Sequence, residues 1–151
     1  MIALFTNATL VTPAVAEHLA TWSPFSIEIS LYGRTAATHD RVTGVAGSFA
    51  RTMRGVRLLM DVGLPLILKT MVLKPNAHEI WDMKRFVEEE LGLEFRFDAM
   101  INPRVDLSIA PLSVRLSPQD VVELDLKDPN RMNEWVKFCN HFNRYAHHAK
   151  Q

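Results

Sequence analysis

Four short segments of the chain have the apolar content and spacing of β-strands: residues 2–6, 26–31, 66–72 and 94–101. Side chains alternate between the two faces of a strand, so apolar residues at every second position mark a face that is buried. In the second segment Ile27, Ile29 and Leu31 make such a face. We therefore expect four strands, each with at least one face packed against other parts of the protein.

The opposite face of three of these segments carries polar or charged residues. They are Glu28, Ser30, Lys69, Arg96 and Asp98. Strands of a parallel sheet that is covered on both faces usually read as continuous Val, Ile and Leu. We therefore predict that these polar faces line a common interior, where the acids and bases partly neutralise each other. The alternative is that some of these charges lie at strand ends in water.

Helical spacing of apolar residues fills the intervals between the strands. The expected helices cover residues 13–21, a short turn or helix at 38–44, residues 48–62 and 77–91, one helix that starts at 117–118, and one from 130 to the end. Thr12, Ser48 and Asn76 are expected to cap three of them. Residues 102–116 read as a long loop, and loops of this length are commonly functional or mobile.

The alternation of strand and helix indicates an α/β protein with parallel strands and right-handed crossovers. We expect helices on one face only, which gives an incomplete, TIM-like β/α barrel. The length of 151 residues suits one domain of this kind. We place the barrel-like domain at residues 1–126 and a C-terminal helical extension at 127–151.

Composition excludes several functional classes. The 17 basic and 17 acidic residues give a formal net charge of zero, which removes any general attraction to nucleic acid or to membranes. No apolar run approaches the roughly 20 residues that span a bilayer, and no secretory signal is visible, so a cytoplasmic location is the default expectation. Cys139 is the single cysteine, and no His or Cys spacing indicates a metal site.

Several short motifs, taken in order, resemble the radical SAM enzymes. They are Thr6-Asn7, Ser30-Leu-Tyr-Gly33, His39-Asp40-Arg41, Gly44-Val-Ala-Gly-Ser-Phe49, Asn76-Ala-His-Glu79, Phe95-Arg-Phe-Asp98, Ile101-Asn-Pro-Arg104 and Arg115-Leu-Ser117. The resemblance is to the branch with a C-terminal SPASM domain, which modifies peptides or activates other enzymes, and it covers about residues 2–126. In that family the catalytic domain is a partial barrel of six strands, of which this chain resembles strands three to six.

The resemblance also implies cofactor-binding residues for S-adenosylmethionine. Ser30 resembles a serine near the ribose and carboxylate of the cofactor, and Glu28 is expected either to bond a ribose hydroxyl or to pair with Lys69. Arg41 resembles a basic residue that holds the cofactor carboxylate; its alternative partner is Asp40. Implied on the rim of the barrel are Thr6, Asn7 and Asp98. Ala8 stands where relatives commonly have glycine.

Three parts of the family pattern are missing from this chain. The first is the Cys-x3-Cys-x2-Cys loop that binds the 4Fe-4S cluster, and the second is the Gly-Gly-Glu-Pro-like segment that meets the amino group of S-adenosylmethionine. The third is the cysteine-rich C-terminal domain. We therefore expect a fragment of a longer protein or a truncated gene product, which holds neither cofactor fully and is inactive alone. No catalytic residue can be named from the sequence.

Three hypotheses for function remain open. The first is a piece of a radical SAM enzyme that modifies a peptide or protein. The second is a non-catalytic α/β barrel module that acts by binding or by oligomerisation, and the third is an unrelated α/β enzyme that uses Glu28, Lys69 and Asp98. An incomplete barrel leaves sheet edges unpaired, and such edges invite association. We therefore expect the chain to form a homo-oligomer.

Overall fold

Four parallel strands form a single sheet in the order β1-β2-β3-β4. The structure, a computed structural model, describes the backbone of residues 1–146 and side chains up to residue 142. The strands are β1 (Ala3–Thr6), β2 (Ser26–Ser30), β3 (Leu66–Met71) and β4 (Glu94–Asp98). The predicted α/β fold with parallel strands is therefore confirmed, although β4 ends three residues earlier than expected.

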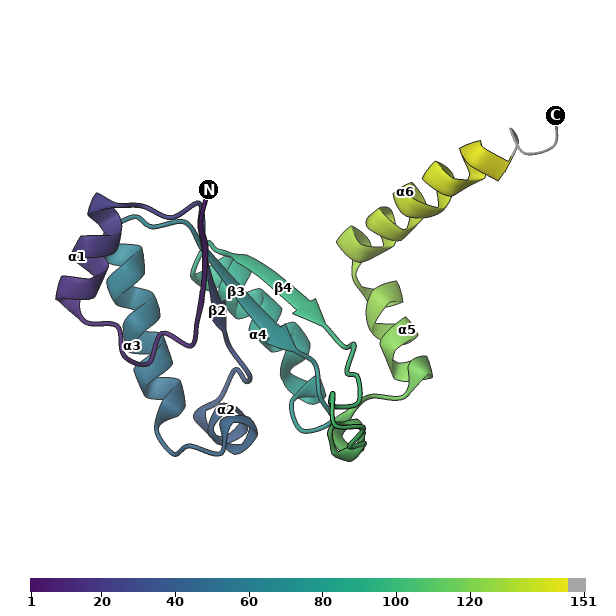
Figure 1. Ribbon diagram of the computed structural model, residues 1–151, viewed down its shortest axis with the longest axis horizontal. Helices are drawn as coiled ribbons and strands as arrows, with labels where there is room; N and C mark the ends of the chain where they lie inside the picture. The colour runs from purple at the N-terminus through teal and green to yellow at the C-terminus, as the bar shows by residue number, and fades with distance from the viewer. Residues whose placement is uncertain (147–151) are drawn as a thin grey trace. The chain divides into compact units, whose positions relative to one another are not determined.

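Each crossover between neighbouring strands contains helix. The elements are α1 (Pro13–Thr21), α2 (Ala36–Thr43) and α3 (Ser48–Asp61), then η1 (Ala77–Glu79), α4 (Ile80–Arg85) and η2 (Phe86–Glu90). Successive right-handed crossovers between adjacent strands put the helices of these crossovers on one face of the sheet. Figure 1 shows α1 and α3 side by side and α4 behind β3 and β4.

The core lies between this face of the sheet and the helices. Ile27, Ile29 and Leu68 from the central strands are completely buried there. Val56 and Leu59 of α3 are buried to the same extent. The alternation read from the sequence therefore identified the core-facing residues of β2 correctly. Burial of each such side chain contributes about 1.5–3 kcal/mol relative to leaving it in water.

The structure corrects two of the expected caps. Ser48 is the first residue of α3, whose N-cap is Gly47 at φ 73°, and the carboxylate of Asp40 accepts the N–H groups of Gly47 and Phe49 there. Asn76 occupies the N-cap position of η1, but its side chain makes no capping hydrogen bond. The continuous helix predicted at 77–91 is divided into a 3₁₀ turn, a short α-helix and a π-helical turn. Thr12 caps α1 as expected.

The chain divides into two units by packing, residues 1–115 and residues 116 onward. The first ends with the 3₁₀ turn η3 (Ala110–Val114), and the second contains α5 (Pro118–Lys127) and α6 (Pro129–Ala146). A Ser117–Asp120 capping box starts α5. Within the second unit Asp125 accepts hydrogen bonds from Arg131 and Trp135. The domain boundary expected at residue 126 stays a prediction.

No helix in residues 1–146 combines the length and the apolar character that crossing a bilayer requires.

Candidate functional site

Charged side chains meet on the face of the sheet that the helices leave open. Lys69 Nζ lies 2.9 Å from Glu28 Oε2 and donates a hydrogen bond to it, and Arg96 Nη1 lies 4.0 Å from Glu28 Oε1. The register places Ser30 beside Lys69, and Lys69 beside Arg96. The predicted common polar face is therefore present. Of the two roles expected for Glu28, the structure contains the pair with Lys69.

Apolar groups border this polar cluster. The Lys69 ammonium lies 4.0 Å from the centroid of the Phe5 ring, a cation–π contact. Phe5 is 61% exposed although it lies beside Glu28 in the sheet. Ile67 and Met71 of β3 are half-buried on the same face. A surface with a balanced ion pair and exposed apolar groups suits a ligand that is itself partly polar and partly apolar.

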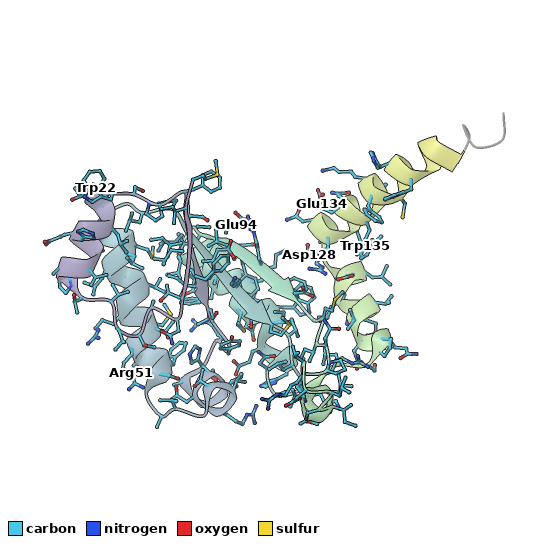
Figure 2. The ribbon with its side chains drawn as sticks, viewed as in Figure 1. Trp22, Arg51, Glu94, Asp128, Glu134 and Trp135 are labelled. Atoms are coloured by element: carbon cyan, nitrogen blue, oxygen red, sulfur yellow. The ribbon has the colours of Figure 1, made fainter. Side chains whose placement is uncertain are left out.

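The part of this face that β4 contributes is more exposed than predicted. Arg96 pairs with Glu94 through a 2.6 Å hydrogen bond, and both side chains are 54% exposed. That bond raises the pKa of Arg96. Figure 2 shows Glu94 at the start of β4. Asp98, two residues beyond Arg96, is exposed, and its carboxylate accepts the N–H of Met100. The alternative, that some of these charges lie in water at strand ends, therefore holds for Asp98.

The other rim residues are found at the C-terminal ends of their strands. Thr6 ends β1, lies beside Ile29 on the helix-covered face, and accepts the N–H of Ala8 through its hydroxyl. Asn7 follows and binds the backbone and hydroxyl of Thr9. Thr6 therefore turns away from the open face that carries Glu28. Ser30, by contrast, lies on that open face at the end of β2.

Arg41 does not pair with Asp40, the alternative partner expected for it. Its guanidinium donates to the carbonyl of Pro75, in the loop that follows β3. Asp40 instead binds the start of α3, and the N–H of Phe49 is the main cause that lowers the Asp40 pKa. Arg41 is exposed and so stays accessible to solvent.

Ala8 adopts the left-handed conformation with φ 57°, which glycine adopts without a steric penalty. It is 1% exposed, and α3 approaches it closely at Gly55. The turn after β1 therefore keeps the geometry of a glycine turn although the residue is alanine.

Three buried side chains that the sequence analysis did not assign to a site connect the loops after β2 and β3. Asn76 donates to the carbonyls of Tyr32 and Met71 and accepts the N–H of Leu73. Glu79 accepts hydrogen bonds from Arg34, Thr35 and Thr38. His39 accepts the N–H of Tyr32.

The local environments of two of these groups shift their pKa values. Burial lowers the pKa of His39, against the opposing effect of Asp40. For Glu79, burial raises the pKa, but the hydrogen bonds from Thr38, Thr35 and Arg34 outweigh burial, and the pKa is lowered. His39 is therefore favoured as the neutral imidazole and Glu79 as the carboxylate. In the sequence, the one indication that these two residues matter is that each belongs to a motif that resembles the radical SAM enzymes.

The residues present fit the two expected cofactors to different degrees. A 4Fe-4S cluster needs several thiolates, and Cys139 is the single cysteine of the chain and lies exposed. Residues 1–146 also contain no group of three His, Cys, Asp or Glu side chains placed for a metal ion. The open face does offer groups for S-adenosylmethionine, because the Ser30 hydroxyl bonds no side chain or backbone group in the described part of the chain.

Comparison with known proteins identifies relatives at the level of sequence. The chain is 37% identical over 92 residues to an AdoMet-dependent heme synthase of Methanosarcina barkeri, over 60% of this chain and 26% of the relative. It is 34% identical to the antilisterial bacteriocin subtilosin biosynthesis protein AlbA of Bacillus subtilis, over 58% of this chain and 20% of that protein. It is 31% identical to a PqqA peptide cyclase of Ruegeria pomeroyi, over 62% and 24%. No protein-family model matches the chain.

A solved structure shares the fold. The structure of native anSMEcpe with bound AdoMet and the Cp18Cys peptide matches 78% of this chain and 33% of its own, with a TM-score of 0.64 and 19% identity. The curated relatives described above are likewise much longer, since the chain spans at most 26% of them.

Proposed function

We propose that this chain, which is similar over 60% of its length to an AdoMet-dependent heme synthase, is part of a radical SAM enzyme of the SPASM-containing type that modifies a peptide or protein. In this proposal the chain supplies one wall of the pocket for S-adenosylmethionine. The substrate then approaches the open face of the sheet. Two of the relatives carry names that refer to a peptide or a bacteriocin product.

One observation carries this proposal: the open polar face reaches the C-terminal ends of the parallel strands. In β/α barrels the C-terminal ends of the strands form the active face. Here that end contains the solvent-accessible hydroxyl of Ser30, close to the Glu28–Lys69 pair. A hydroxyl and a carboxylate are suitable partners for the ribose and amino acid parts of the cofactor.

The expected cofactor-binding residues differ in how directly the structure places them for this role. Ser30 and Glu28 share the open face, and Glu28 keeps a second oxygen 4.0 Å from Arg96 that a ribose hydroxyl can approach. Arg41 in α2 and Asp98 at the end of β4 are both exposed. Thr6 and Asn7 act through the turn after β1, since their side chains bind Ala8 and Thr9.

Under this proposal, the chain has no catalytic activity by itself. When bound, the cluster supplies the electron that cleaves S-adenosylmethionine, and three thiolates must hold it. With one cysteine this chain cannot provide them. The cluster-binding residues are therefore proposed to lie in a polypeptide segment outside these 151 residues.

The DNA that flanks the reading frame tests the proposal directly. We expect an in-frame upstream segment that encodes a Cys-x3-Cys-x2-Cys pattern. The extended protein, reconstituted anaerobically with iron and sulfide, is then expected to cleave S-adenosylmethionine to 5′-deoxyadenosine and methionine when reduced. An in-frame stop codon immediately upstream of Met1 would contradict the proposal.

A second candidate function is a non-catalytic module that assembles with copies of itself. Strands β1 and β4 are the outer strands of the sheet in the described residues. Ile2, Phe5 and Phe25, in and beside β1, are 61–72% exposed. An unpaired strand edge bordered by apolar groups favours association. A genuine start and stop at the ends of this frame would favour this candidate.

A further inference from the structure

The loop that joins β2 to α2, residues 31–35, has its backbone held by side chains from other parts of the chain. The N–H of Tyr32 donates to His39 Nδ1 at 3.1 Å, and the carbonyl of Tyr32 accepts from Asn76 Nδ2 at 3.1 Å. The N–H of Leu31 donates to the carbonyl of Lys69 on β3, and the Leu31 side chain is fully buried. The loop is therefore fixed at consecutive residues directly after Ser30.

Glu79 holds the second half of this loop. Its Oε2 accepts the N–H of Arg34 at 2.7 Å and of Thr35 at 3.2 Å, and its Oε1 accepts the hydroxyls of Thr35 at 2.8 Å and Thr38 at 2.7 Å. The residue is 8% exposed, and its closest cationic candidate, His78 Nε2, lies 3.7 Å away. A buried carboxylate is costly unless it is hydrogen-bonded. Donors from the loop and the start of α2 meet this requirement.

Close packing against α2 restricts the backbone of this loop at Gly33. A Cβ added to Gly33 would lie 2.6 Å from the backbone nitrogen of His39 and 2.8 Å from the Cβ of Thr38. Both atoms belong to α2, so neither can move away as the end of a flexible side chain can. The loop therefore passes against the helix at a distance that only glycine permits.

We infer that Glu79, Asn76 and His39 are positioning residues: they hold the 31–35 loop in one conformation and so set the placement of Ser30 and Tyr32 at the cofactor rim. The assignment of that rim to S-adenosylmethionine rests on the proposed function. The role inferred for these three residues involves no contact with S-adenosylmethionine. They act by fixing the backbone beside the groups that do, which lowers the ordering cost of binding.

The test uses the full 151-residue chain with ¹⁵N labelling, a Thr38→Val variant and a Thr38→Ser variant. Valine keeps the shape of threonine and removes one donor to Glu79, whereas serine restores the hydroxyl. We expect amide hydrogen exchange at Arg34 and Thr35 to become about tenfold faster in Thr38→Val, because each lost bond lowers local stability. Thr38→Ser should return toward the wild-type rate, and exchange at Phe95 on β4 should stay unchanged.

The same samples are titrated with S-adenosylhomocysteine. The wild-type protein is expected to show weak binding, with shifts at the amides of Ser30 and Tyr32, and Thr38→Val should weaken that binding severalfold while Thr38→Ser should not. Glu79→Gln serves as a stronger variant, and Glu89→Gln is its control, because Glu89 is an exposed acid in η2, within the same crossover between β3 and β4.

The possible results distinguish the positioning role from the proposed function. Unchanged exchange at Arg34 and Thr35 in both Thr38→Val and Glu79→Gln would overturn the positioning role. Faster exchange with unchanged affinity would overturn it too, and leave the proposed function standing. If the wild-type chain shows no chemical-shift change at Ser30 and Tyr32, the cofactor assignment fails. The exchange rates alone then decide whether Glu79, Asn76 and His39 fix the loop.

Discussion

Lys69 reaches across from β3 to Glu28 on β2, with its ammonium nitrogen 2.9 Å from the carboxylate. The pair is partly buried, since the two side chains are 33% and 15% exposed. Water screens such a pair less than it screens an ion pair on an open helix surface. The open face of the sheet is therefore organised by a charge pair between neighbouring strands.

We predict that this pair contributes measurably to stability. Glu28→Gln or Lys69→Met should each lower the free energy of unfolding by about 1–2 kcal/mol, and a double-mutant cycle should give a coupling of about 1 kcal/mol. Lys69→Met also removes the contact with the Phe5 ring. Urea denaturation, followed by tryptophan fluorescence, measures each value.

The matched control is the exposed pair Glu123–Lys127 on α5, whose charged atoms lie 3.7 Å apart. Its side chains are 65% and 62% exposed. The same two substitutions there should give a coupling below about 0.5 kcal/mol. Equal coupling at the two pairs would show that the partly buried position adds nothing.

We predict a steric effect at Gly55. A Cβ there would lie 2.1 Å from the carbonyl oxygen of Ala8, so Gly55→Ala should destabilise the protein by at least about 2 kcal/mol despite the better helix propensity of alanine. Gly92→Ala is the comparison, because its φ is +67° but no atom lies within 4 Å, and it should cost about 1 kcal/mol. Thermal and urea unfolding of the two variants decide the order.

Stability should fall as the pH is lowered from neutral. The lowered pKa of His39 means that the unfolded state binds more protons between the folded pKa and the ordinary value of 6.5, so stability is lost as the pH falls below about 6.5. The lowered pKa values of Asp40 and Glu79 act in the same direction, since their contribution is lost as the pH falls through the folded values. Urea unfolding at a series of pH values tests this.

A His39→Asn variant isolates the first part of that pH dependence. Asparagine retains an oxygen acceptor for the N–H of Tyr32 and does not titrate. Its stability should change less than that of the wild type between pH 7 and pH 5.5. His18→Asn, the same substitution at an exposed position of α1, is the matched control.

Self-association through β1 is a further prediction. Ile2 precedes this outer strand and is 72% exposed. Ile2→Lys should shift the chain toward monomer in size-exclusion chromatography with light scattering, because a charged edge opposes strand pairing. Val105→Lys, at a fully exposed loop position, should have no effect. A wild-type chain that is monomeric at high concentration would contradict the expected oligomer.

The sequence predicted those parts of the molecule that depend on local periodicity. The alternation in residues 26–31 located the core-facing isoleucines and placed Glu28 with Lys69 on the other face. It failed where long-range partners decide the geometry. The capping of α3 by Asp40, eight residues upstream of Ser48, has no periodic signal. The same is true of Glu79, whose hydrogen-bond donors lie more than forty residues away.

The distance along the chain between Arg34 and Glu79 has a consequence for synthesis on the ribosome. The two residues are 45 positions apart, and domains form as their segments emerge during translation. The loop after β2 therefore leaves the exit tunnel well before the carboxylate that orders it. Until η1 has emerged and docked, the nascent chain carries that turn without its partner, so the turn takes its final conformation only after β3 has been made.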